Sequence, residues 1–201
     1  MSKINALCVY CGSGPGTDPA FVETARSFGK ILAENDIRLI YGGGSAGLMG
    51  ALAEAVLEHG GEITGIIPEF LTRRERPRHL AQKLIVTRDM HERKRLMFEQ
   101  ADGFVALPGG VGTLEEVVEQ LTWVQLGHHN KPVLLANIKG FWQPLIELIG
   151  HMQTLGFIHS EHRFNYLTVE RIEDALPSLI AHCEKLQPAL TADQKKVIER
   201  L

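Results

Sequence analysis

The sequence contains few cysteines and no long apolar run. Three cysteines in 201 residues form an odd, sparse set, which is a poor framework for disulfide bonds and fits a reducing compartment. No apolar stretch approaches the roughly 18 residues that cross a bilayer. The first three residues lead into a short apolar segment without a small-residue cleavage pattern. We therefore expect a cytoplasmic protein that does not bind a membrane.

The chain also lacks a large excess of charge of either sign. Its net charge is −3 and its pI is about 6.3, which argues against general binding to nucleic acids or membranes, since both surfaces are anionic. The partner should be a small molecule or another protein. With 201 residues and 44% hydrophobic content, the chain suits one α/β domain over 1–201, with roughly 187–201 as a C-terminal extension.

One stretch, from Asp102 to Glu116, has the pattern of a ligand site. An apolar segment at 103–107 predicts a buried strand of a parallel sheet, and the glycines that follow Pro108 allow a ligand to approach the backbone. Thr113 would open a helix whose free N–H groups favour an anion such as phosphate. The same letters also form a T-x-x-E capping box, in which Glu116 would bond back to the Thr113 backbone and have no chemical role. This stretch alone leaves both interpretations open.

Strand, turn and helix alternate along the rest of the chain. Strands are predicted at 4–11, 38–41, 62–68, 132–136 and 166–169, and helices behind Asp18 and after Gly47, at 141–155 and at 171–185. Six or seven strands in this alternation predict a Rossmann-like, doubly wound parallel sheet flanked by helices. The turn at 42–47 formally matches G-x-G-x-x-G. That match is weak for a dinucleotide site, because the acidic Glu62 stands at the start of the next strand, not at its end.

Three further patterns concern basic residues, cysteines and histidines. The stretch 72–95 holds nine basic and three acidic residues, either an anion-collecting rim or a solvated loop and helix face; Arg93 and Lys94 begin a helix there. Cys8 and Cys11 should point to opposite faces of a strand, which disfavours redox pairing. The pairs His128–His129 and His159–His162 lie in apparent loops without a complete ligand pattern, so no metal site is expected.

The helix that contains Glu116 should continue past this residue, and we expect it to turn Leu114, Val117, Val118 and Leu121 to the sheet.

Several motifs together resemble the Lonely Guy family of cytokinin riboside 5′-monophosphate phosphoribohydrolases, sometimes labelled lysine-decarboxylase-like. They are CGSGPG, LIYGGGSAGLMGALAEA, GGEITGIIP, DMHERK, and LPGGVGTLEE followed by EQLTWVQLGHHNKPV, over roughly residues 5 to 150. The resemblance implies a Rossmann-like fold, a homodimer, and hydrolysis of the N-glycosidic bond of a purine nucleoside monophosphate, with AMP or a cytokinin nucleotide as substrate. It implies no cofactor.

The resemblance also assigns roles to particular residues. Arg93 and Glu116 match the catalytic arginine and glutamate of the family. Its substrate-binding elements match Lys94, Gly109, Gly110, Val111, Gly112, Thr113, Leu114 and Glu115, then Gly44, Gly47 and Met49 of the second glycine turn, and, less securely, Thr122 and Glu75.

The implied chemistry suits these residue types. Cleaving an N-glycosidic bond builds positive charge on the ribose, and a carboxylate beneath C1′ can stabilise that charge and take a proton from water. A carrier of a phosphate-bearing cofactor is the alternative, although a carrier needs only anion donors. A DNA-handling protein is disfavoured because aromatic residues do not interleave with the basic run. A pyridoxal-phosphate decarboxylase needs a Schiff-base lysine, and no lysine stands near the glycine turn at 109–112.

Overall fold

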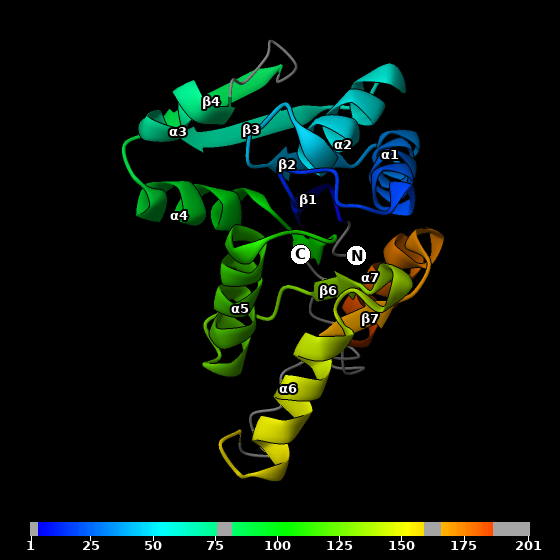
Figure 1. Ribbon diagram of the computed structural model, residues 1–201, viewed down its shortest axis with the longest axis vertical. Coiled ribbons are helices and arrows are strands. Elements are labelled where there is room, and N and C mark those ends of the chain that lie inside the picture. The colour runs from blue at the N-terminus through cyan, green and yellow to red at the C-terminus, as the bar shows by residue number, and fades with distance from the viewer. Residues whose placement is uncertain (1–3, 76–81, 159–165, 187–201) are drawn as a thin grey trace, which may run out of the picture.

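Seven parallel strands form the sheet at the centre of the computed structural model, which describes residues 4–75, 82–158 and 166–186 (Figure 1). The strand order is β4-β3-β2-β1-β5-β6-β7, and every neighbouring pair is parallel. The strands are β1 (Ala6–Tyr10), β2 (Arg38–Tyr41), β3 (Ile63–Pro68), β4 (Lys83–Thr87), β5 (Gly103–Ala106), β6 (Val133–Ala136) and β7 (Leu167–Val169). The predicted doubly wound, Rossmann-like sheet is confirmed.

Helices connect the strands and cover both faces of the sheet. They are α1 (Pro19–Glu34), α2 (Gly47–Glu58), α3 (Glu69–Glu75), α4 (Met90–Gln100), α5 (Val111–Gln125), α6 (Gln143–Thr154) and α7 (Ala175–Leu186), with short 3-10 turns at Ile138–Gly140 and Ile172–Asp174. The chain winds outward from β1 to β4, crosses back to β5 beside β1, and winds outward again to β7. The direction of winding therefore reverses between β1 and β5, which is where open α/β sheets bind ligands.

Two hydrophobic clusters lie on opposite faces of the sheet. One packs buried residues of α1, α2 and α7 against alternate strand positions such as Leu7 and Val9. The other packs α4, α5 and α6 against the intervening positions, including Cys8 and Phe104. Since both faces are covered, β1, β5 and β6 are buried at every position, which explains their unbroken apolar sequences.

The first and fourth helices begin at side-chain caps. Asp18 precedes α1 and accepts a hydrogen bond from the Ala20 N–H, as its position before Pro19 predicted. Asp89 precedes α4 and accepts one from the Glu92 N–H at 2.8 Å. No helix among the described residues is both long and apolar enough to span a bilayer.

The structure differs from expectation between residues 69 and 87. One interpretation of the basic stretch 72–95 was a solvated loop before the helix of Arg93, but α3 and the edge strand β4 occupy parts of it. β4 pairs with β3 from Lys83 to Thr87, with Leu84 and Val86 exposed. An edge strand pairs with only one neighbour and carries charged and exposed residues, so its sequence lacks the apolar pattern by which buried strands are predicted. Arg76 and Arg78 of that stretch, His159 and His162, and the extension 187–201 lie outside the described residues.

Helix α5 also presents a different face from the one expected. Val117 and Leu121 are buried as predicted, whereas Leu114 is 38% and Val118 41% exposed. The buried face includes Thr113, Glu116 and Gln120 instead. The prediction followed hydrophobicity alone, and it was wrong for Leu114 and Val118 because Thr113 and Glu116 on the buried face border a cavity that receives polar side chains.

Candidate active site

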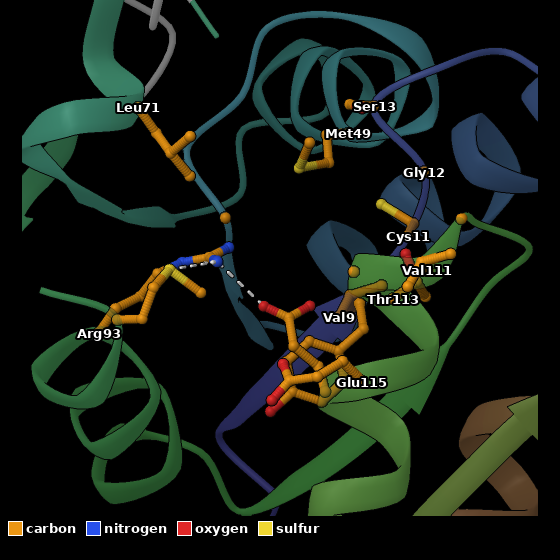
Figure 2. A pocket seen from close by; sticks show the side chains of 16 residues that line it. Val9, Cys11, Gly12, Ser13, Met49, Leu71, Arg93, Val111, Thr113 and Glu115 are labelled. Carbon is orange, nitrogen blue, oxygen red and sulfur yellow. Dashed lines mark hydrogen bonds and ion pairs between the residues drawn. The ribbon is translucent and has the colours of Figure 1, made fainter. Parts of the chain in front are cut away.

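A cavity of about 340 Å³ opens at the carboxyl ends of β1 and β5, where the winding of the sheet reverses. The loops after these two strands are joined by a hydrogen bond from the Gly12 N–H to the Pro108 carbonyl at 3.0 Å. The lining comes from segments far apart in the chain: Val9 to Ser13, Gly42, Met49, Leu71, Met90, Arg93, Gly110 to Thr113, Glu115 and Glu116 (Figure 2).

The start of α5 forms one wall of this cavity. Gly110 is the N-cap, no side chain caps the helix, and Val111 to Thr113 are its first three residues. A Cβ placed on Gly110 or Gly112 would meet no atom within 4 Å, so the backbone is open to a ligand on that side. Uncapped N–H groups and the positive end of the helix dipole make this wall attractive to an anion.

The capping-box interpretation of Glu116 is wrong. Because α5 begins at Val111, Thr113 is the third helical residue and is buried, so it does not cap the helix. Glu116 lies one turn further along and pairs with a different helix. Sequence letters could not decide this, because the helix start depends on how the glycine turn packs against the loop after β1.

The start of α2, behind the second glycine turn, is already occupied. The N–H groups of Leu48 and Met49 donate to the Gly12 carbonyl at 3.0 and 3.3 Å. Gly47 has φ +58°, and a side chain there would overlap the backbone of Ser13 and Gly14. Of the three residues that the resemblance marks in this turn, Met49 reaches the cavity, whereas Gly44 and Gly47 do not line it. This turn serves mainly to pack two loops together.

Arg93 and Glu116 form a buried ion pair at the floor of the cavity. Arg93 Nη1 lies 3.1 Å from Glu116 Oε1, and the two side chains are 11% and 10% exposed. Arg93 Nε also donates to the Ile66 carbonyl at 3.1 Å, which fixes the guanidinium against β3. A Cβ on Gly42 would come within 2.6 Å of Arg93 Nη2, so a larger residue there would displace the guanidinium from its observed position. In Figure 2, a dashed line marks this ion pair at the guanidinium of Arg93.

Lys94 makes a second bridge between α4 and α5. Its Nζ lies 2.7 Å from Glu115 Oε1 and 2.8 Å from Glu119 Oε1, and its side chain is 15% exposed. Burial lowers the pKa of Lys94, but its hydrogen bonds to Glu115 and Glu119 raise the pKa overall. Lys94 does not itself line the cavity, although Glu115 does.

Cys11 faces the same cavity as a neutral thiol. Burial raises the pKa of Cys11, and the negative charge of Glu116 raises it further. Burial raises the pKa of Cys8 as well. Both thiols are free, and they belong to hydrophobic clusters on opposite faces of the sheet. Neither has the lowered pKa of a reactive cysteine, so the C-x-x-C spacing does not form a redox pair.

Three further residues implied by the resemblance, Gly109, Leu114 and Thr122, do not line the cavity. Thr122 Oγ1 donates to the Val118 carbonyl of its own helix at 2.7 Å. Glu75 ends α3, and its side chain lies outside the described residues. Leu71 and Met90 do line the cavity and were missed. Met90 lies three residues before Arg93 on α4, and this helical spacing was the available signal.

The histidine pair after α5 belongs to an aromatic cluster. The rings of His128 and His129 lie 5.6 and 5.1 Å from that of Phe98, and Trp123 packs edge-on against Phe98 at 5.2 Å. Burial, then the charge of Lys131, lowers the pKa of His129 to about 4. Within the described ranges, no three His, Cys, Asp or Glu side chains come together as a metal site would require. These rings pack the base of α5.

Comparison with known proteins places the chain in a family. Residues 49–179 match the family described as "Possible lysine decarboxylase". A cytokinin riboside 5′-monophosphate phosphoribohydrolase of Rhodococcoides fascians is 43% identical over 87% of this chain and 88% of its own length. The LOG7 phosphoribohydrolase of Arabidopsis thaliana is 39% identical over 98% of this chain and 89% of its own length.

Solved structures support the fold. The Moco carrier protein of Chlamydomonas reinhardtii superimposes with a TM-score of 0.67 at 22% identity, over 92% of this chain and all of that one. The molybdenum cofactor binding protein of Rippkaea orientalis gives 0.67 at 22% identity, over 90% and 98%. At this identity the likeness concerns the fold alone. The sequence relatives, which the chain covers nearly end to end, establish that it belongs to the Lonely Guy family of cytokinin riboside 5′-monophosphate phosphoribohydrolases.

Proposed function

We propose that this protein hydrolyses the N-glycosidic bond of a purine nucleoside 5′-monophosphate, AMP or a cytokinin riboside 5′-monophosphate, to the free base and ribose 5-phosphate. One observation carries the proposal: the buried Arg93–Glu116 pair shares a cavity of about 340 Å³ with the uncapped start of α5. An anion site and a fixed carboxylate thus lie beside each other, as cleavage of a phosphorylated nucleoside requires.

The 5′-phosphate is assigned to the first turn of α5. Val111, Gly112 and Thr113 line the cavity there, and Gly112 leaves its side open. The competing helix start at α2 already donates to the Gly12 carbonyl, which favours the glycine turn at 109–112 for phosphate. Each charge-assisted hydrogen bond contributes about 1.5–3 kcal/mol, so several of them select strongly for a monophosphate.

Glu116 is assigned to the anomeric carbon. As the base leaves, positive charge develops at C1′, and the Glu116 carboxylate stabilises it and takes a proton from the attacking water. Arg93 holds this carboxylate in one orientation through the 3.1 Å contact, while Ile66 holds Arg93. Met49, Leu71 and Met90 supply an apolar surface on the same cavity for the purine ring.

Two other functions account less well for the geometry. A phosphate-cofactor carrier needs anion donors, but it has no use for a buried ion pair, whose desolvation is costly. A pyridoxal-phosphate decarboxylase needs a lysine whose pKa is lowered, since only a neutral amine forms a Schiff base. Lys94 shows the opposite shift, with a pKa raised by Glu115 and Glu119.

The assembly and compartment are also proposed. The exposed face of α5 carries Val111, Leu114 and Val118, and Leu126 follows the helix at 76% exposure. An apolar stripe of this kind suits a second copy of the chain, so we propose a homodimer. Trp123, three residues before Leu126, packs edge-on against Phe98 and is not part of this stripe. Three free cysteines fit the reducing cytoplasm.

The direct test is incubation with AMP alone, followed by chromatography for free adenine. We expect adenine and ribose 5-phosphate in equal amounts without any added cofactor. Stoichiometric binding of AMP with no release of adenine would favour the carrier instead.

A further inference from the structure

The cluster of Lys94, Glu115 and Glu119 contains one member that reaches the cavity. Lys94 Nζ bridges the two carboxylates at 2.7 and 2.8 Å. Glu115 is 49% exposed and lines the cavity, whereas Glu119 is 22% exposed and does not line it. The two glutamates therefore share a partner and a helix but differ in their access to a ligand.

The position of Glu115 on α5 places it next to a bound sugar. Glu115 follows Val111 by four residues and Gly112 by three, so it lies one turn beneath the anion-binding N–H groups on the same side of the helix. Side chains on a helix lean toward its N-terminus, which brings the carboxylates of Glu115 and Glu116 toward the phosphate end. With the phosphate at the helix start and C1′ at Glu116, the ribose extends over the part of the cavity that Glu115 lines.

The chemistry of this position matches a ribose hydroxyl. An ionised carboxylate only accepts hydrogen bonds and offers about four lone-pair sites, so Glu115 can bind Lys94 through Oε1 and still accept another donor. The 2′-hydroxyl is the sugar donor adjacent to C1′. In glycoside cleavage, a hydrogen bond to this hydroxyl strengthens as positive charge builds on the ring.

Lys94 makes a second carboxylate tolerable at this position. Glu115 and Glu116 stand side by side near the site assigned to a phosphate, and three negative groups would repel one another. Lys94, which also pairs with Glu119, offsets part of the charge of Glu115, while Arg93 offsets that of Glu116. Lys94 thus acts through Glu115 and not by direct contact with the phosphate.

We infer that Glu115, held by Lys94, accepts a hydrogen bond from the ribose 2′-hydroxyl and makes the enzyme select ribonucleoside over 2′-deoxyribonucleoside 5′-monophosphates. This inference rests on the proposed hydrolysis of nucleoside monophosphates and adds the sugar specificity of that site.

The test compares kcat/KM for AMP and dAMP in the parent, Glu115→Ala and Glu119→Ala. Glu119→Ala is the matched control, because it removes the other carboxylate on Lys94 from the same helix. We expect the ratio of kcat/KM for AMP to that for dAMP to be about tenfold higher in the parent than in Glu115→Ala, as one charge-assisted hydrogen bond predicts. Glu115→Ala should lower kcat/KM for AMP about tenfold and leave that for dAMP within about threefold. Glu119→Ala should keep the ratio of the parent.

Comparing variants cancels the intrinsic difference in reactivity between the two sugars. A ratio of kcat/KM for AMP to that for dAMP that is the same in Glu115→Ala as in the parent would overturn the inference. An equal loss of preference in Glu119→Ala would overturn it too, because it would assign the cluster a structural role in joining α4 to α5. Absence of adenine release from AMP by the parent would instead refute the proposed function itself.

Discussion

Replacing Glu116 by glutamine separates the chemical role of this residue from its role in packing. The amide has nearly the same shape and keeps a polar oxygen beside Arg93 Nη1, which lies 3.1 Å from Oε1. It lacks the negative charge. Since Glu116 does not form a capping box, the start of α5 is untouched by the substitution.

The structure gives a magnitude for the stability change. Removing one partner of a fully buried ion pair costs about 3–5 kcal/mol, because the other charge stays unpaired. Here both side chains border a cavity, Arg93 keeps its bond to the Ile66 carbonyl, and the amide oxygen replaces the carboxylate oxygen. We therefore expect a loss of about 1–2 kcal/mol, and a melting temperature lower by about 2–8 °C for a chain of this size.

Glu116→Gln should affect the rate of adenine release much more than the free energy of unfolding. An amide neither takes a proton from water nor offsets positive charge on the ribose, and loss of a general base costs about 10²- to 10⁴-fold. We expect Glu116→Gln to bind AMP as well as the parent and to release adenine at least about a hundredfold more slowly at saturating AMP.

The measurements are kcat from adenine release and the melting temperature from calorimetry. Glu119→Gln is the control, because it removes a carboxylate from the same helix without touching the cavity lining. If the Glu116→Gln variant keeps kcat within a few fold of the parent, the catalytic role of Glu116 is refuted and Glu115 becomes the next candidate.

Four further predictions test other parts of the site. Adenosine should be hydrolysed at least about a hundredfold less efficiently than AMP, because it lacks the group assigned to the α5 N-terminus; comparable kcat/KM values would contradict this. Gly42→Ala should lower kcat at least about tenfold, since its Cβ would come within 2.6 Å of Arg93 Nη2 and displace the guanidinium; unchanged kinetics would show that Arg93 need not sit where it does. Val118→Glu should convert a homodimer to a 22.3 kDa monomer in light scattering, and a parent that is already monomeric would refute the dimer. Alkylation of Cys11 by iodoacetamide, followed by mass spectrometry, should be slow at pH 7 and should still accelerate at pH 9, because the pKa of this thiol is raised. Glu116→Gln removes a negative charge that raises this pKa, so the variant should react faster at fixed pH. A rate that reaches its plateau below pH 8 would contradict the raised pKa.

Much of the fold was determined by short-range sequence features. Apolar segments such as 103–107 predicted buried strands, and the cap at Asp18 predicted the start of α1. Their alternation with helical segments predicted a parallel sheet wound in both directions. The glycines after Pro108 predicted an open, anion-binding turn, and α5 begins there with no side-chain cap. These features are readable because each depends on neighbours within a few positions along the chain.

The tertiary structure alone decided which alternatives apply. Glu116 is paired with Arg93 of α4, and the rest of α4, the strand β5 and the glycine turn separate the two residues in the sequence. No local pattern distinguishes that pair from a capping box. The second glycine turn is closed because the Gly12 carbonyl occupies the start of α2. Leu71 and Met90 reach the cavity because α3 and α4 fold over the ends of β3 and β2. Contacts between distant segments depend on how the layers pack, and that packing decides which of several anion-friendly turns becomes a site.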